Sequence, residues 1–437
     1  MNFKQTSKIM AMSILVSMIT LTIHAQDYFN HDGIRYKIES FANQELRMTF
    51  PSEADYTTTE LVIPATIRTK QGQVWTVTAI GEEAFSKISW GNAGYKKLKK
   101  VSIPKTVKTI HRDAFKDSDI EEVTADCQTE LHVAEHRFTN SNLKNNNYLK
   151  TVNLGANANI ATCRGLSKYC GIAFSPDEDT PFIYIQKVTL NPANKNLVMV
   201  DGVLYNKSKT ELLYFPRQKE FSYVMPSTLK AIPRGAFIKS NVTSITLSPA
   251  LEKIEESTFS YCKKLKSVII PGSVKVIERW AFSGCVSLEK IKLSEGLQII
   301  QSRAFEACYS LQEISIPQSL NEMRDLVFFR CKGLKNITIP SCVTKLYSRE
   351  FQECQSLEKI IIPESVKEVE DDAFLRCNEL KYIYCFAKSP NFKFPFYPVP
   401  YEYNIITVKE VHVPKGCKSA YENSGWKRGD ISIIDDL

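Results

Sequence analysis

The sequence predicts a β-rich α/β solenoid, in which coils of 23 residues stack on one another and a cap closes each end. Two observations support this prediction. Phenylalanine recurs every 23 residues, and each copy is followed by cysteine three residues later and leucine six residues later. An apolar–any–apolar triplet then follows, usually closed by proline. The repeated pairs are Phe259 and Cys262, Phe282 and Cys285, Phe305 and Cys308, Phe328 and Cys331, Phe351 and Cys354, and Phe374 and Cys377.

Each part of the repeat predicts one element. The triplet, as in Val268-Ile269-Ile270 before Pro271, alternates with period two and predicts a short strand that proline ends. The Phe-x-x-Cys-x-x-Leu stretch predicts a helical turn, and the Val274-x-x-Ile277 stretch returns the chain to the next coil. One coil buries too little apolar surface to offset the entropy of ordering its backbone, so we expect stability to come from stacking.

Less regular copies of the repeat lie upstream. Ala84-Phe85, Ala114-Phe115 and Ala236-Phe237 match part of it, and Val152-x-Leu154 and Val188-x-Leu190 predict further strands. Between these copies the register breaks, with an asparagine-rich and an acidic stretch that we interpret as loop insertions.

The pattern Ala-Phe-x-x-Cys-x-x-Leu-x-x-Ile-x-Ile-Pro-x-x-Val-x-x-Ile resembles the BspA-like, Treponema-type leucine-rich repeat of bacterial surface proteins. Three flanking segments resemble parts of the same family: Asp32-Gly33-Ile34-Arg35-Tyr36, Asp201-Gly202-Val203-Leu204-Tyr205-Asn206, and Val413-Pro414-Lys415-Gly416 with Tyr421 and Trp426. The resemblance implies an extracellular leucine-rich-repeat solenoid that binds or adheres through its surface without enzymatic activity. The family often has glycine after the second isoleucine of the unit, as in Ile80-Gly81, but later units carry Glu255, Glu278 or Gln301 there. This departure argues against a left-handed backbone at that position.

The N-terminus has the pattern of a secretory signal peptide. Lys4 and Lys8 precede the apolar stretch Ile9–Ile23, and Ala25 offers a small residue for cleavage. The alternative is a retained membrane anchor, although the stretch is shorter than the ~20 residues that a spanning helix needs. We expect an exported protein, secreted or at the cell surface with the periplasm as another possibility, and no membrane span in the mature chain.

These patterns divide the chain into six parts. They are a signal peptide (1–25), an N-terminal cap (26–58), leucine-rich repeats (59–125), irregular repeats with loop insertions (126–186), regular leucine-rich repeats (187–386) and a C-terminal cap (387–437).

Composition argues against several classes of function. The formal net charge of +8 is spread along the chain rather than concentrated, so we expect no nucleic-acid partner. There is no Gly-x-Ser-x-Gly, phosphate-loop or His-Glu-x-x-His motif, so we expect no catalytic residues and no enzyme. His31, His111 and His412 are isolated in the sequence, and we expect them to face solvent. No cofactor is implied, and we expect a monomer.

The twelve cysteines leave two questions open. Six of them share one column of the repeat, which indicates small buried side chains with free thiols. Disulfides between adjacent coils are the alternative, because the coil spacing would permit them. Cys127, His132 and His136 could hold a metal, but their spacing is not that of a standard zinc site. We therefore interpret them as ordinary structural residues and expect no metal.

Two surfaces are candidate ligand-binding sites. The first is the outward position of each strand, which includes Lys292 and Ile361, although a plain solvated face is the alternative. The second is the aromatic segment 382–403, with Tyr382, Tyr384, Tyr401 and Tyr403, which could instead cover the end of the core. The sequence thus favours a non-enzymatic binding or adhesion protein whose solenoid surface recognises a host or bacterial surface protein or glycan. The alternative is a glycan-binding accessory protein that uses the aromatic segment.

Overall fold

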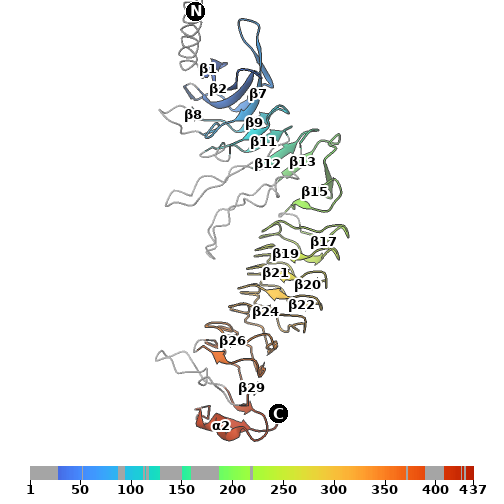
Figure 1. Ribbon diagram of the computed structural model, residues 1–437, viewed down its shortest axis with the longest axis vertical. Coiled ribbons are helices and arrows are strands. Elements are labelled where there is room, and N and C mark those ends of the chain that lie inside the picture. The colour runs from blue at the N-terminus through green and yellow to red at the C-terminus, as the bar shows by residue number, and fades with distance from the viewer. Residues whose placement is uncertain are drawn as a thin grey trace, which may run out of the picture. The chain divides into compact units, whose positions relative to one another are not determined.

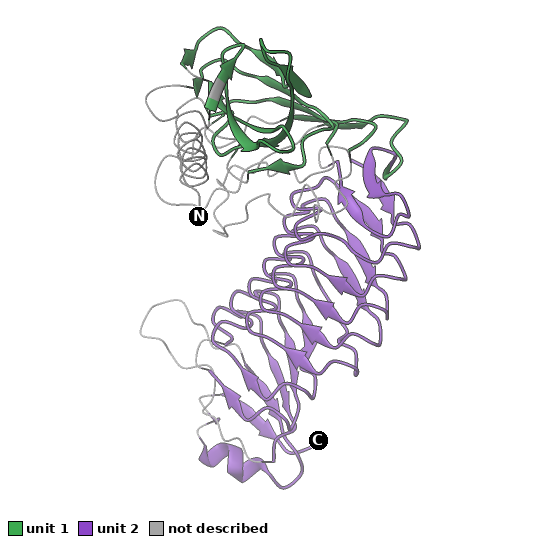
Figure 2. Cartoon of the chain, turned by 45° about the horizontal axis from the view of Figure 1, so that its top comes forward, with its two compact units in different colours: residues 1–197 green, residues 198–437 purple. Residues whose placement is uncertain are grey.

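In a computed structural model, the chain forms two compact units, residues 1–197 and residues 198–437 (Figures 1 and 2). The predicted signal peptide, residues 1–25, lies outside the described residues. The structure describes residues 28–51, 53–86, 94–111, 114, 118–127, 150–158, 187–216, 220–370, 373–388, 408–424, 426–427 and 430–437.

The first unit opens with an antiparallel meander that continues into parallel strands. Strands β1, β2 and β3 pair antiparallel, β3 and β10 pair parallel with β7, and β6 pairs antiparallel with β7. Buried Tyr36 and Leu46 line the inner face of the meander. The strands are β1 (Tyr28–His31), β2 (Ile34–Ser40), β3 (Glu45–Pro51), β6 (Thr66–Arg68), β7 (Val74–Ile80) and β10 (Thr109–Ile110).

A parallel sheet follows in the same unit, in the order β5–β9–β11–β12–β13. Val152 and Leu154 are buried on β12, and β13 contains Val188 and Leu190, so the two strands predicted within the irregular region are confirmed. The strands are β5 (Glu60–Val62), β9 (Lys100–Ile103), β11 (Glu122–Ala125), β12 (Thr151–Leu154) and β13 (Lys187–Leu190), with a separate pair β4 (Ala54–Asp55) and β8 (Gly94–Tyr95).

The second unit contains the regular coils, whose strands stack like rungs in Figure 2. The predicted strands form two parallel sheets, β17–β18–β20–β22 and β25–β27–β29–β30–β31. The alternation is confirmed, because Val268 and Ile270 are buried while Ile269 between them is exposed. The strands are β14 (Leu197–Val200), β15 (Val203–Asn206), β16 (Leu212–Tyr214), β17 (Ser222–Val224), β18 (Ser244–Thr246), β20 (Ser267–Ile270), β22 (Lys290–Leu293), β25 (Asn336–Thr338), β27 (Lys359–Ile362), β29 (Tyr382–Cys385), β30 (Glu410–His412) and β31 (Ser432–Ile434).

Two details of the predicted coil were wrong. The return stretch forms a second short strand, because its backbone pairs with the same stretch of the next coil, as Val276 pairs with Ile299. The Phe-x-x-Cys stretch is a run of tight turns rather than a helical turn. The return strands are β19 (Lys253–Ile254), β21 (Val276–Ile277), β23 (Ile299–Ile300), β24 (Glu322–Met323), β26 (Lys345–Leu346) and β28 (Glu368–Val369).

The turns explain why no helix forms there. Residues two before and two after each core phenylalanine from Phe237 to Phe351 have positive φ, for example Arg303 at 59° and Ala307 at 57° around Phe305. The alternating backbone directs N–H groups at the next coil, so that Phe305 donates to the carbonyl of Val327 at 3.1 Å. The position after the second isoleucine, including Gly81, is not left-handed, as its varied residues indicated.

Stacked phenylalanines and buried thiols form the core of the coils. The rings from Phe237 to Phe374 lie 5.0–6.0 Å apart, centroid to centroid, with interplanar angles of 28° or less. The six column cysteines are buried and free, and each thiol donates to the carbonyl of the previous coil's phenylalanine at 3.0–3.3 Å. Burial raises the pKa of five of these thiols, those of Cys285, Cys308, Cys331, Cys354 and Cys377, and the value is about 12 for Cys331. The column therefore links the coils through weak S–H···O bonds.

Strand pairing is interrupted between residues 313–333 and 336–356, although backbone hydrogen bonds still join the two coils, as from the Lys335 N–H to the Gln312 carbonyl at 2.9 Å. Within these described residues, β24 does not pair with β26, and the face strands of the two coils do not pair either. In the turn, the carboxylate of buried Glu350 accepts the N–H groups of Leu326 at 2.8 Å and Val327 at 3.0 Å. Other coils have alanine, threonine or valine at the Glu350 position, as at Ala304, Thr258 and Val327. Glu350 is thus a large polar residue at the step where strand pairing between coils is interrupted.

The C-terminal residues extend the last sheet. Strands β30 and β31 add to it in parallel, and helix α2 (Lys418–Asn423) lies between them in the chain. The Tyr421 and Trp426 side chains are fully buried, and their rings meet edge to face at 5.2 Å between centroids. The Tyr421 hydroxyl donates to the Ala387 carbonyl at 2.5 Å, which ties the helix to the last regular coil.

Candidate binding surface on the C-terminal sheet

The outer face of the sheet β25–β27–β29–β30–β31 holds two columns of side chains. Strand register aligns them, because every second residue of a strand points to the same face. The buried residues Ile360, Ile383 and Val411 alternate with them and face the core. The columns are Asn336, Lys359, Tyr382, Glu410 and Ser432, and, two residues later, Thr338, Ile361, Tyr384, His412 and Ile434.

The structure brings together three of the six candidate ligand-binding residues. Tyr382 and Tyr384 lie on β29, Ile361 lies beside Tyr384 on β27, and all three are partly exposed. Lys292 lies on β22 in the other sheet of this unit. Tyr401 and Tyr403 lie outside the described residues. We define the outer-face patch as Lys359, Ile361, Tyr382, Tyr384, Glu410 and His412.

Tyr384 occupies the centre of this patch and has partners on two sides. Its ring stacks on the His412 imidazole, with 4.3 Å between centroids and 5° between planes. The Lys359 ammonium lies 4.2 Å from the centroid of the Tyr384 ring. Because β27 and β30 flank β29 on opposite sides, these partners cover opposite faces of the ring. The ring is thereby held in place, with its edge and hydroxyl left for contact.

His412 is buried, and the expectation that it faces solvent was wrong. Its Nδ1 lies 2.9 Å from Oδ1 of Asp436, and its Nε2 lies 3.3 Å from Oε2 of Glu410. The strand places its side chain between Tyr384 and the carboxylates, and the three contacts together remove it from water.

The second sheet face is chemically different. Val224 is 67% exposed and Ile269 is 62% exposed, and strand register aligns both with Thr246 and Lys292. This face presents serine, threonine, aliphatic and lysine side chains without aromatic rings, so Lys292 belongs to a separate surface from the outer-face patch.

Sequence reasoning missed Lys359, Glu410 and His412. A usable signal existed for His412, because Val411-His412-Val413-Pro414 repeats the apolar–any–apolar–proline triplet and places the histidine at the outward position. Asp436 follows the last strand and has no repeat position, so nothing in the sequence pointed to its contact with His412. Within the described residues, no group of three or more histidine, cysteine, aspartate or glutamate side chains is arranged to hold a metal ion.

Comparison with known proteins identifies the family. The model of the BspA type leucine-rich repeat region matches six copies over residues 74–169, 230–355 and 275–394, more than half of the chain. The chain therefore belongs to the BspA-type leucine-rich-repeat proteins, and its stacked coils are the leucine-rich-repeat solenoid. No curated protein matched the chain.

Three solved structures resemble the chain. Pneumococcal vaccine antigen PcpA is 18% identical, with a TM-score of 0.46, over 94% of this chain and 98% of that one. A leucine-rich repeat protein from Eubacterium ventriosum is 19% identical, with a TM-score of 0.49, over 80% and 94%. A leucine rich cell surface protein from Faecalibacterium prausnitzii is 18% identical, with a TM-score of 0.42, over 82% and 94%. Among the described residues of this chain, no helix has the length and apolar character to cross a bilayer.

Proposed function

We propose that the protein is exported and acts, without catalysis, as a binding or adhesion protein that holds a macromolecular partner on the outer-face patch. Leucine-rich-repeat solenoids are rigid scaffolds that display regularly spaced side chains, which suits recognition of a large partner. The signal-peptide pattern of residues 1–25 supports export to the surface or the medium.

The observation that carries this proposal is the arrangement around Tyr384. Interface hot spots are enriched in tyrosine, and a ring already ordered by its neighbours loses little freedom when a partner binds. Lys359 and His412 order this ring before any partner arrives. They also occupy both of its faces, so that a protein contact at the ring edge is favoured over sugar stacking on its face.

Arrays of host and bacterial surface proteins, run in parallel with glycan arrays, test the proposal. Tyr384→Ala should weaken binding to protein hits at least tenfold, whereas Ser315→Ala, at an outward position remote from the patch, should leave binding unchanged. Protein hits that Tyr384→Ala does not affect, or a response confined to glycans, would contradict the proposal.

A further inference from the structure

The turns of the second unit carry almost all arginines of the regular coils. We define the arginine ridge as Arg279, Arg303, Arg330, Arg349 and Arg376, each two or three residues from a core phenylalanine. Between residues 226 and 388, only Arg234, also in a turn, and Arg324, beside a return strand, lie outside this set. The strand face carries its positive charge as lysine instead, for example Lys290 and Lys292 on β22. Arginine differs from lysine in binding carboxylates with two parallel N–H groups.

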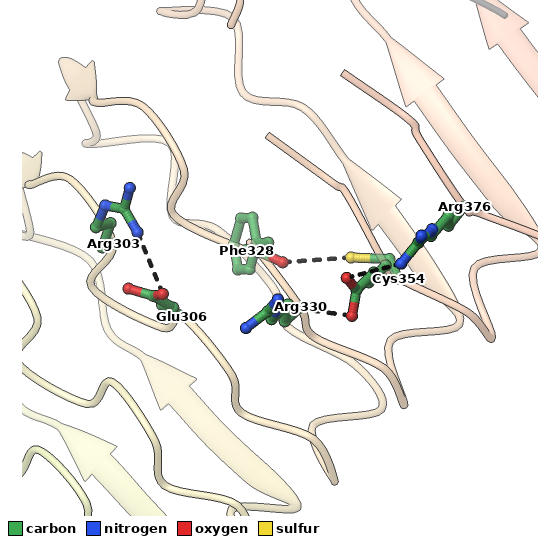
Figure 3. A network of polar contacts seen from close by, with 7 residues as sticks. Arg303, Glu306, Phe328, Arg330, Cys354 and Arg376 are labelled. Carbon is green, nitrogen blue, oxygen red and sulfur yellow. Dashed lines mark hydrogen bonds and ion pairs between the residues drawn. The ribbon is translucent and has the colours of Figure 1, made fainter. Parts of the chain in front are cut away.

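The acidic partners of the ridge lie beneath the guanidinium groups. Glu353 is 12% exposed, while Arg330 and Arg376, which both contact it, are 46% and 48% exposed. Glu306 is 11% exposed and its partner Arg303 is 30% exposed. Figure 3 shows Arg303, Glu306, Arg330 and Arg376 on successive turns, with the contacts as dashed lines. Because the carboxylates are recessed, the guanidinium groups form the outer layer of the ridge.

Each of these contacts engages a single guanidinium nitrogen. Arg303 uses Nη1 at 3.2 Å, Arg330 uses Nε at 3.5 Å, and Arg376 uses Nη1 at 3.5 Å. A guanidinium has five N–H donors, so donors remain on Arg303 and Arg330 for a second carboxylate. Arg349 is exposed and makes no ion pair within the described residues.

Aromatic rings lie among the arginines. The Arg279 guanidinium carbon is 3.9 Å from the Trp280 ring centroid, and that of Arg330 is 5.0 Å from the Phe329 centroid. Tyr309 is 39% exposed beside them, with the Lys332 ammonium 4.8 Å from its ring centroid. Arginine with tryptophan and tyrosine is the composition of protein–protein hot spots.

We propose that the arginine ridge is a second interaction surface, which binds an acidic, extended segment of a protein partner along successive coils. Carboxylates of that segment would occupy the guanidinium donors that Glu306 and Glu353 leave open. The arginine ridge shares no residue with the outer-face patch. A result that contradicts one proposal therefore leaves the other unaffected.

Binding of fluorescent poly-L-glutamate, followed by anisotropy at low and at physiological salt, tests this proposal. The triple variant Arg330→Gln, Arg349→Gln and Arg376→Gln should bind at least tenfold more weakly than the wild type. The control variant Lys266→Gln, Lys290→Gln and Lys335→Gln removes the same charge from exposed positions at or just before the face strands, and it should lose less than twofold. Equal loss in both variants would overturn the proposal, because net charge alone would then explain binding.

Two further experiments test the arginine geometry and the chemical class of the partner. Replacing Arg330, Arg349 and Arg376 by lysine preserves charge and should still weaken binding several-fold; unchanged binding would refute the bidentate role. Dextran sulfate that binds the ridge where poly-L-glutamate does not would overturn the assignment to an acidic protein. Thermal melting of each variant checks that the fold is intact, and the single exposed substitution Arg349→Gln should still give a measurable loss.

Discussion

Replacing Glu350 by glutamine should remove a pH-dependent loss of stability. The Glu350 carboxyl is 1% exposed, and burial raises its pKa from the ordinary 4.5 to about 8, although the Leu326 and Val327 N–H groups act in the opposite direction. Between pH 4.5 and 8, the folded state therefore keeps a proton that the unfolded state has released. A group with a raised folded pKa contributes stability at low pH and loses it as pH rises through this window.

The expected size follows from linkage. One pKa unit corresponds to 1.36 kcal/mol, so raising the pH from 5 to 8 should cost the wild type about 3 kcal/mol through Glu350 alone. Glutamine has the same shape but does not titrate, so Glu350→Gln should lack this part of the slope. At pH 5 the variant should be less stable by about 1 kcal/mol, because its amide nitrogen cannot accept the second N–H bond, whereas the hydroxyl oxygen of the protonated carboxyl group still can.

Urea unfolding of the full chain at pH 5, 6, 7 and 8 measures the slope. Glu364→Gln is a matched control, because it removes an exposed carboxylate one coil further on. A slope that Glu350→Gln leaves as steep as in the wild type would refute the assignment of the buried carboxyl as the titrating group.

Two other substitutions test the packing between coils. Phe305→Ala should destabilise the protein by about 3–5 kcal/mol, because the ring is fully buried between Phe282 and Phe328, whereas exposed Tyr309→Ala should cost less than about 1 kcal/mol; similar urea midpoints for both would contradict the stack. Cys308→Ser should cost about 1–3 kcal/mol through burial of a hydroxyl group, and an unchanged melting temperature would show that the column is loosely packed.

Most of the structure of the regular coils could be predicted because the same sequence positions are buried in every coil. Residues that face the core must be apolar in every coil, so Phe, Cys and Leu positions recur and can be read directly. The alternation around Ile269 likewise followed from strand geometry. The second strand and the left-handed turns were not predictable in the same way. They form because backbone groups of neighbouring coils hydrogen-bond to one another, and this pairing does not require a particular side chain. Arg303 and Ala307 share a positive φ without sharing chemistry.

The candidate surface was predicted only in part. Ile361 stood out as an outward strand residue, and Tyr382 and Tyr384 stood out as members of an aromatic segment, but their partners come from other strands. His412 was expected in solvent because it is isolated in the sequence, whereas its burial depends on Asp436 beyond the last strand. Glu350 was missed for the opposite reason, since a charged residue in an apolar column reads as a solvated turn when the sequence is seen alone.

Thiol labelling during urea unfolding tests most directly whether the coils stack through the cysteine column. The six column thiols are buried and their pKa values are raised where a shift is resolved, so they should resist an alkylating reagent in the native protein. Mass spectrometry of each peptide should show them labelled only as the fold is lost. Labelling of the column in native protein, or disulfides found in its place, would contradict the stacked core.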